Sequence, residues 1–210
     1  MKTDSQLCSM LSEAMGMLSF PRATHIVHYL LQTWGIPGAV GEFGCHAGRT
    51  AVLMASLTDK PLYLYDSFKG LPPTCEHDKT SDVFHEGAMS ISEDAVRSRF
   101  RFHGLSQPSI VSKFFNEIQD ADLPEHFAFV HLDGDFYDSI LSSLVHAYPR
   151  MSPGGIIIID DFGWEELPGV IKAVNDYCIM ERALRPIPLQ GINGKPCYQA
   201  LLKKPSWRRG

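Results

Sequence analysis

The sequence contains no apolar run that approaches the ~20 residues of a membrane-spanning helix. The N-terminal residues Met1–Ser5 also lack the apolar core of a secretory leader. The 5 cysteines are scattered and odd in number, and none belongs to a C-x-x-C pair, which argues against a disulfide framework and against a zinc site. We therefore expect a cytoplasmic protein with reduced thiols and without membrane contact.

Positive charge is also in short supply. The 19 Lys and Arg residues are outnumbered by 24 Asp and Glu residues, and the net charge is −5. This balance disfavours a nucleic-acid partner, because a surface that binds nucleic acid is normally lined with cations. What remains is an ordinary globular composition, 44% hydrophobic and 20% charged, in a chain of 210 residues. That length suffices for one α/β domain with a small appendage.

The dinucleotide fingerprint G-x-G-x-x-G is absent too. In its place Glu42, Gly44 and Gly48 form an E-x-G-x-x-x-G turn between an apolar segment and a helical pattern. The glycines permit close approach of a ligand, and the free N–H groups of a helix start favour an anionic group such as a carboxylate. Asp66 ends the next apolar segment, and its carboxylate can accept two hydrogen bonds from a ribose diol. These features predict a nucleoside ligand and leave both NAD and S-adenosylmethionine (SAM) open.

Apolar segments alternate with helical patterns along the chain, which predicts βαβ units and a mostly parallel sheet with helices on both faces. Strands are expected at residues 39–44, 61–66, 109–112, 127–132, 156–159, 184–189 and 198–202. Helices are expected at residues 50–57, 93–103, 139–148 and 167–177, and turns at residues 152–155 and 191–194.

Two further segments lie outside this alternation. Residues 5–33 have helical spacing with Pro21 between two helices, so we expect residues 1–35 to form a helical cap over the sheet or over a neighbouring subunit of a homo-oligomer. Residues 36–210 would then form the main domain. Residues 70–92 contain several prolines and glycines and little periodicity. A connection of this length is usually functional, and we expect a lid.

Acidic residues follow the two most apolar segments. The first cluster is Asp133 with Asp135, and the second is Asp160 with Asp161. The carboxyl ends of parallel strands form the edge at which open α/β sheets bind ligands. Carboxylates gathered there would repel one another unless a cation lay among them, and a divalent ion with oxygen ligands is the obvious candidate. The alternative is that these residues cap the following helices or face water.

Three strings extend this pattern: Y-D-S-F-K-G-L-P at 65–72, H-L-D-G-D-F-Y-D-S at 131–139 and I-D-D-F at 159–162. With the glycine turn they occur in order between residues 20 and 203, and here the chain resembles the macrocin O-methyltransferase family of class I SAM-dependent methyltransferases. These enzymes methylate sugar hydroxyls on macrolides and related natural products. The resemblance implies a Rossmann-like fold with a mostly parallel seven-stranded sheet and an N-terminal helical cap.

The resemblance also implies an activity and its cofactors. The expected reaction is O-methyl transfer, dependent on SAM and Mg²⁺, to a hydroxyl of a sugar or diol on a small molecule. The implied SAM contacts are Glu42, Gly44, Cys45, His46, Gly48, Thr50, Asp66, Ser67, Phe68 and Asp133. The implied metal ligands are Asp133, Asp160 and Asp161.

Methyl transfer from a sulfonium to oxygen needs an aimed and at least partly deprotonated hydroxyl. Asp133, Asp135 and His131 are the candidates for the base, with Asp133 favoured because it should lie beside the ion. For His131, a hydrogen-bonded core histidine is an equal alternative. Three other readings of the whole chain stay open: a metal-independent methyltransferase of small molecules, an NAD-dependent Rossmann-fold oxidoreductase, and a non-catalytic protein that uses the same fold as a scaffold.

Overall fold

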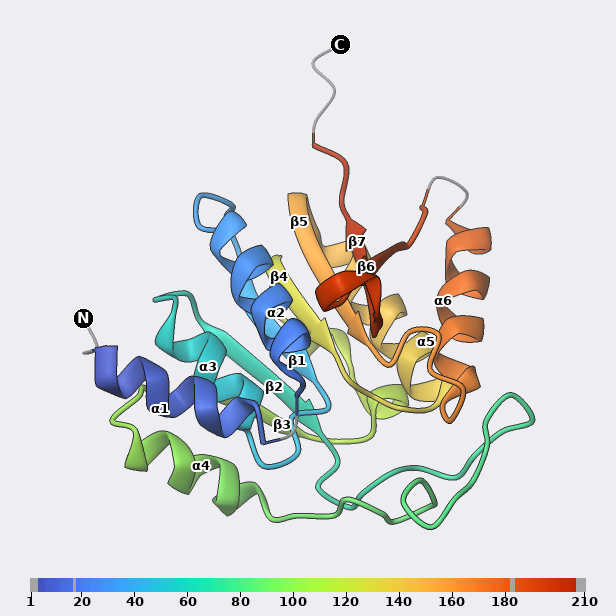
Figure 1. Ribbon diagram of the computed structural model, residues 1–210, viewed down its shortest axis with the longest axis horizontal. Coiled ribbons are helices and arrows are strands. Elements are labelled where there is room, and N and C mark those ends of the chain that lie inside the picture. Colours follow the sequence, from blue (N-terminus) through green and yellow to red (C-terminus); the bar gives the residue numbers. More distant parts are fainter. Residues whose placement is uncertain (1–3, 17, 182–183, 207–210) are drawn as a thin grey trace.

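The computed structural model describes residues 4–16, 18–181 and 184–206, and within them seven strands form one central sheet (Figure 1). The strands are β1 (Ala39–Phe43), β2 (Leu62–Asp66), β3 (Ser109–Ser112), β4 (Phe127–Leu132), β5 (Met151–Asp160), β6 (Ile187–Gln190) and β7 (Pro196–Lys203). Their order in the sheet is β3-β2-β1-β4-β5-β7-β6. The strands β1 to β5 pair in parallel, whereas β7 runs antiparallel to both β5 and β6. The expected seven-stranded, mostly parallel sheet is confirmed.

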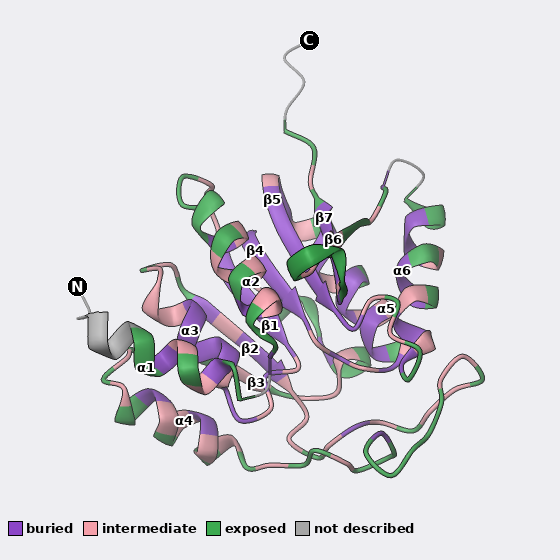
Figure 2. Cartoon of the chain, viewed as in Figure 1, coloured by how far each residue is buried: buried purple, intermediate pink, exposed green. Residues whose placement is uncertain are grey.

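Helices cover both faces of the sheet (Figure 1). They are α1 (Asp4–Ala14), α2 (Phe20–Gln32), α3 (Arg49–Ser56), α4 (Glu93–Phe102), α5 (Tyr137–Ala147) and α6 (Pro168–Met180). Side chains of α1 to α4 share one hydrophobic core with one face of the sheet, and side chains of α5 and α6 share a second core with the other face. Figure 2 shows the result, a buried sheet between helices that are buried on their inner sides.

Strands β4 and β5 are neighbours in the interior of the sheet and are largely buried. Every residue of β4 is buried, and so is the run Ile156–Ile159 of β5. Runs without polar alternation are what a strand needs when helices cover both of its sides. Because both strands end at the same edge, the acidic residues that follow them are brought side by side.

The N-terminal helices pack on the sheet of their own chain. In α2 the side chains of Ala23, Ile26 and Leu30 are buried in the same core as α3 and α4. The expected proline boundary lies at the start of this helix, because Pro21 falls in its first turn, where a missing N–H removes no helical hydrogen bond. The assignment of residues 1–35 as a separate cap stays a prediction, and residues 1–3 and 17 of that range lie outside the described part of the chain.

The turn expected at residues 152–155 is wrong, because these residues lie inside β5. Phe127 of β4 faces Met151 and Phe129 faces Ile156, so the extra residues bulge out of the pairing and the strand then continues. Gly154 has a φ of +84° and donates its N–H to the carbonyl of Lys204 at 3.0 Å. The bulge is stable because the end of β7 satisfies its backbone groups.

Residues 67–92 connect β2 to α4 without a helix or strand and run along the edge of the sheet where the parallel strands end (Figure 1). Leu71 and Phe84 are the large side chains of this segment that are buried. Among the described residues, none belongs to a helix that is long and apolar enough to cross a membrane.

Candidate active site

A cavity of about 570 Å³ lies at the carboxyl ends of β1, β2, β4 and β5. From β1 the chain continues to β2 on one side of the sheet, and from β4 it continues to β5 on the other side. The cavity lies between β1 and β4, where this direction reverses. This is the position at which open α/β sheets bind ligands. The cavity is wide enough for a nucleoside cofactor and part of a second molecule.

The glycine turn forms one wall of the cavity. Gly44 has a φ of +89°, and a Cβ atom there would lie 1.9 Å from the carbonyl oxygen of Asp133. Gly48 has a φ of +73° and precedes α3, and a Cβ atom there would lie 2.9 Å from the side chain of Val96. Both positions therefore require glycine, and the backbone passes close to the cavity without a side chain in the way.

Asp66 faces the cavity from the end of β2. Its Oδ2 accepts a hydrogen bond from the His46 N–H and its Oδ1 accepts one from the Phe68 N–H, both at 2.8 Å. Each oxygen keeps a second lone pair, so the carboxylate can still accept a diol. The backbone thus holds Asp66 in the orientation that a ribose would need.

The structure brings together most, but not all, of the predicted SAM contacts. Those that line the cavity are Gly44, His46, Thr50, Asp66, Ser67 and Asp133. Those that do not are Glu42, Cys45, Gly48 and Phe68. Cys45 is turned into the core, where burial raises the pKa of its thiol well above the usual range, and Phe68 packs partly buried against the same core.

The acidic residues meet at the far side of the cavity. Asp133, Asp135 and Asp161 each offer a carboxylate oxygen, and these oxygens lie within 4.8 Å of one another. Asp133 and Asp160 form a second such group with His131. The three predicted metal ligands are thus divided between two groups that share Asp133, with Asp160 beside His131 in one and Asp161 beside Asp135 in the other.

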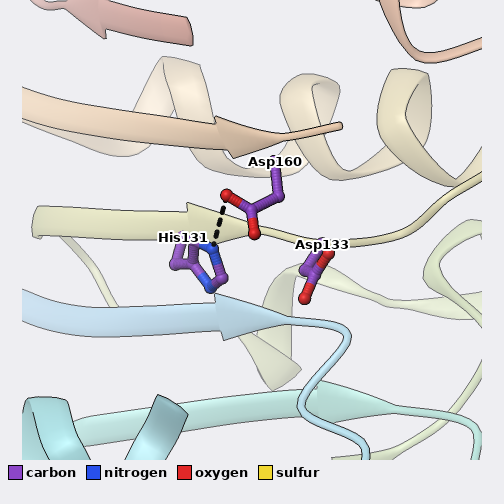
Figure 3. A group of neighbouring side chains, drawn as sticks. All are labelled: His131, Asp133 and Asp160. Atoms are coloured by element: carbon purple, nitrogen blue, oxygen red, sulfur yellow. Dashed lines mark ion pairs between the residues drawn. The ribbon is translucent and has the colours of Figure 1, made fainter. Parts of the chain in front are cut away.

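His131 lies behind this cluster and does not reach the cavity (Figure 3). Its Nδ1 is 2.9 Å from Oε1 of Glu42, and its Nε2 is 3.5 Å from Oδ1 of Asp160. The pairing of β1 with β4 places Glu42 directly opposite His131. His131 is thus buried between Glu42 and Asp160, and it belongs with Asp133 and Asp160 to a group that could hold a metal ion. Both roles expected for His131 stay predictions.

Arg22 of α2 also contacts the acidic residues. Its Nη2 lies 2.8 Å from Oδ1 of Asp161 and its Nη1 lies 3.5 Å from Oδ2 of Asp160. Its Nε donates a hydrogen bond to the carbonyl of Cys197 at 2.8 Å. Gln199 of β7 completes the surroundings by donating a hydrogen bond to Oδ1 of Asp160.

Burial and mutual repulsion shift the pKa values of this cluster. Burial, and then the charge of Asp160, raises the pKa of Asp133 well above its usual range, and burial with Asp161 does the same for Asp135. Burial and Asp160 raise the pKa of Asp161 to about 6. Burial also opposes the charge of Asp160, but His131 and Arg22 outweigh it and lower its pKa. The cluster is therefore short of positive charge.

The residues present fit a divalent cation. Oδ2 of Asp160 is buried and accepts no hydrogen bond, and carboxylate oxygens are the ligands that a hard cation prefers. Arg22 and His131 do not fully balance the negative charge of the carboxylates. A cation bound by Asp133, Asp160 and Asp161 would supply the missing positive charge. Asp135 lies close enough to contribute a further oxygen.

Aromatic side chains wall the cavity beyond the acidic cluster. Trp164 follows β5, Tyr198 lies on β7 and Phe84 comes from the segment over the site. The ring centroids of Phe84 and Trp164 are 5.6 Å apart at 89°, and those of Trp164 and Tyr198 are 6.2 Å apart at 33°. Such a wall suits the C–H face of a sugar or another flat, weakly polar group.

The sequence patterns did not identify Arg22, Gln199 or Tyr198 as site residues. For Arg22 there is a signal in retrospect: it lies in the first turn of α2, where the helix dipole disfavours a cation and no acidic residue is present to offset it. A basic residue in that position needs an acidic partner elsewhere. Gln199 and Tyr198 lie on a strand whose pairing with β5 no local pattern reveals.

The chain is similar to known O-methyltransferases. Residues 12–198 match the family described as Macrocin-O-methyltransferase (TylF). The mycinamicin III 3''-O-methyltransferase of Micromonospora griseorubida is 29% identical over 178 residues, which cover 78% of this chain and 68% of that relative. The 8-demethyl-8-(2,3-dimethoxy-alpha-L-rhamnosyl)-tetracenomycin-C 4'-O-methyltransferase of Streptomyces olivaceus is 29% identical over 156 residues, which cover 68% of this chain and 59% of the relative.

A solved structure extends the likeness to the fold. The O-methyltransferase NovP matches with a TM-score of 0.74 and 24% identity, over 88% of this chain and 80% of NovP. The chain spans 68%, 59% and 58% of the lengths of the curated relatives that it matches.

Proposed function

Because the chain belongs to the macrocin O-methyltransferase family and has the fold of class I SAM-dependent methyltransferases, we propose that it methylates a hydroxyl of a sugar or diol on a small natural product, with SAM as donor and a divalent cation as partner. The observation that carries the proposal is one cavity with two sets of lining residues. Gly44 and Asp66 line it on the donor side, and Asp133, Asp160 and Asp161 line it on the acceptor side. Methyl donor and hydroxyl acceptor would meet there. The family favours this reading over an NAD-dependent oxidoreductase and over a scaffold.

The donor would lie along the strand ends of β1 and β2. The ribose diol would bind the carboxylate of Asp66, and the carboxylate of the methionine part would face the free N–H groups at the start of α3, near Thr50. The close backbone at Gly44 leaves room for the sulfonium between this wall and Asp133. The methyl group would then point toward the acidic cluster.

Asp133 is our choice for the base. It lines the cavity between the two halves of the site, where its carboxylate would lie within reach of the acceptor hydroxyl. As the methyl group passes from sulfur to the acceptor oxygen, the hydroxyl proton would pass to a carboxylate oxygen of Asp133, leaving S-adenosylhomocysteine and the methyl ether. Asp135 is the second candidate, since it also lines the cavity.

The cation is part of the proposal because the carboxylates fit it. Asp133, Asp160 and Asp161 would hold Mg²⁺, with His131 and Gln199 fixing the orientation of Asp160 from behind. When bound, such an ion makes a nearby hydroxyl more acidic and holds it in place. A metal-independent methyltransferase remains the alternative, and it predicts no loss of activity with a chelator.

The acceptor class follows from the wall and from the relatives. The names of the two relatives describe methyl transfer onto a mycinamicin and onto a rhamnosyl-tetracenomycin. A sugar ring stacked on Trp164 or Tyr198 would leave its hydroxyls toward Asp133, which is the orientation that the reaction requires. The acceptor itself is to be found by experiment.

The test is mass spectrometry of deoxysugar glycosides, catechols and simple diols incubated with methyl-labelled SAM and Mg²⁺. The proposal expects label in a glycoside or diol, loss of labelling in excess EDTA and recovery with added Mg²⁺. Methylation at full rate in EDTA would remove the cation from the proposal. If the protein does not bind SAM, the assignment of SAM as the methyl donor is wrong as well.

A further inference from the structure

We propose that Arg22 is the built-in counter-ion of the acidic cluster and that its charge limits how tightly a divalent cation binds there. The inference rests on the proposed function, since it concerns the same carboxylates. It also gives the N-terminal segment, in which the sequence patterns indicated only packing, a part in the active site. Arg22 would be a positioning residue that acts through Asp160 and Asp161.

The contacts of Arg22 are those of a fixed charge. The guanidinium faces Asp161 at 2.8 Å and Asp160 at 3.5 Å, and its side chain is only 15% exposed. Its Nε donates a hydrogen bond to the Cys197 carbonyl at 2.8 Å. A side chain held by partners on two strands cannot swing away without leaving a buried carboxylate unpaired.

The position of Arg22 opposes its own charge, which sets it apart from an incidental ion pair. It lies in the first turn of α2, where the helix dipole is unfavourable to a cation. Because its side chain is only 15% exposed, solvent does little to stabilise the guanidinium. The attraction of the acidic cluster must outweigh both costs, and the cluster must in turn be stabilised by Arg22.

A divalent cation on Asp133, Asp160 and Asp161 would share two carboxylates with this guanidinium. Two positive centres on the same carboxylates repel each other at short range in a site shielded from water. Removal of the guanidinium charge should therefore tighten the cation, whereas removal of a group that merely orients ligands should weaken it. The two roles predict opposite signs.

Arg22 also connects the acidic cluster to the acceptor wall. Arg22 donates a hydrogen bond to the carbonyl of Cys197, the residue before Tyr198. Tyr198 has a φ of +55°, and its ring centroid lies 6.0 Å from the guanidinium of Arg22. That ring lines the cavity beside Trp164. A change at Arg22 is thus expected to alter the KM for the acceptor in addition to the affinity for the cation.

The test measures Mn²⁺ affinity by the electron paramagnetic resonance of free Mn²⁺, without turnover. Arg22→Met should bind Mn²⁺ about tenfold or more tightly than the parent protein, and Arg22→Lys, which keeps the charge, should stay within about threefold of it. Arg97→Met is the matched control, because it removes an arginine from an ion pair with Glu93 on α4, away from the site. Unchanged or weaker Mn²⁺ binding in Arg22→Met overturns the inference.

If the Arg22→Met protein does not fold, a second pair of variants tests the inference. Asp161→Asn and the double variant Arg22→Met/Asp161→Asn both lack the Asp161 charge and differ only in Arg22. The double variant should bind Mn²⁺ more tightly, and equal or weaker binding again overturns the inference. A parent protein without Mn²⁺ binding whose Arg22→Met variant does bind would support the counter-ion role while refuting the proposed metal dependence. An absence of binding in every protein would refute both.

Discussion

At the scale of single residues, Asp66 joins the fold to the donor. Its carboxylate accepts two backbone N–H groups and faces the cavity. Asp66→Ala is expected to weaken SAM by roughly 1–3 kcal/mol, because the ribose loses its acceptor and the loop loses an anchor. Calorimetric titration with SAM measures this. Asp59→Ala, an exposed acid in the loop before β2, is the control and should leave the affinity as it is. Equal affinity in both variants would refute the placement of the ribose.

The acidic cluster separates binding from chemistry. Asp133→Asn should lower single-turnover rates by about 10²–10⁴-fold, the usual range for loss of a positioned base, while the Kd for SAM changes little. Asp161→Asn should be the mildest of the acidic variants, because an amide oxygen still ligates a hard cation. Rapid-quench kinetics with labelled SAM gives the rates. If Asp135→Asn is inactive and Asp133→Asn is not, the base is Asp135.

At the scale of elements, α1 is attached to α4 through an ion cluster. Glu13 lies 3.0 Å from Arg99 and 3.1 Å from His103, and although burial acts the other way, these partners lower the pKa of Glu13 below its ordinary 4.5. A carboxyl group whose pKa is lowered on folding stabilises the fold above its unfolded pKa and loses that effect as the pH falls through its folded pKa.

Glu13→Gln should therefore reduce the free energy of unfolding near neutral pH by roughly 0.2–1 kcal/mol, the range of partly exposed ion pairs. The difference should disappear as the pH falls through the folded-state pKa of Glu13, because Glu13 is then protonated in both states. Urea denaturation near neutral pH and at a series of acidic pH values measures the difference. Glu125→Gln, at a side chain that is 92% exposed, serves as the control. If the two proteins still differ in unfolding free energy in acid, the loss of stability in Glu13→Gln comes from packing and not from the charge of Glu13.

The segment over the site is attached at one helix start. Asp78 accepts a hydrogen bond from the Tyr137 N–H at 2.8 Å, and Tyr137 opens α5 just after the first acidic cluster. Asp78→Ala should weaken this attachment by about 0.5–2 kcal/mol, as the loss of a helix cap does. Limited proteolysis should then cut residues 70–92 faster, and SAM with a methylated product should slow the cutting. Asp82→Ala, an exposed acid of the same segment, should behave as the parent. Cutting at equal rates in all states would refute a lid.

At the scale of the whole molecule, the choice of cofactor is visible in thermal stability. A ligand that binds only the folded state stabilises it by ~2.7 kcal/mol at 100 times its Kd. For a domain of this size that raises the Tm by roughly 5–10 °C. SAM should produce such a shift and NAD should not, as differential scanning calorimetry can show. A rise in Tm with NAD and none with SAM would favour an NAD-dependent oxidoreductase instead. Assembly into a homo-oligomer stays a prediction that light scattering can check.

The sequence by itself determined the order of elements and the chemistry at the ends of the strands. Short unbroken apolar runs between turn signals indicated buried strands, and Gly44 and Gly48 indicated a tight backbone turn that favours glycine. Asp66, Asp133 and Asp160 were found because each lies at the end of a strand or directly after one, so that a local pattern carries the information. The family resemblance lay in the same short strings.

Only the tertiary structure decided which residues surround those carboxylates. Arg22 and Cys197 are 175 positions apart in the chain yet share a hydrogen bond, and Gln199 meets Asp160 through the pairing of β7 with β5. The contact between His131 and Glu42 likewise depends on the pairing of β1 with β4, which places the two residues opposite each other. Periodicity reports whether a side chain faces the core, but a buried charge is compensated by whichever group the packing brings near, and packing is a property of the whole chain.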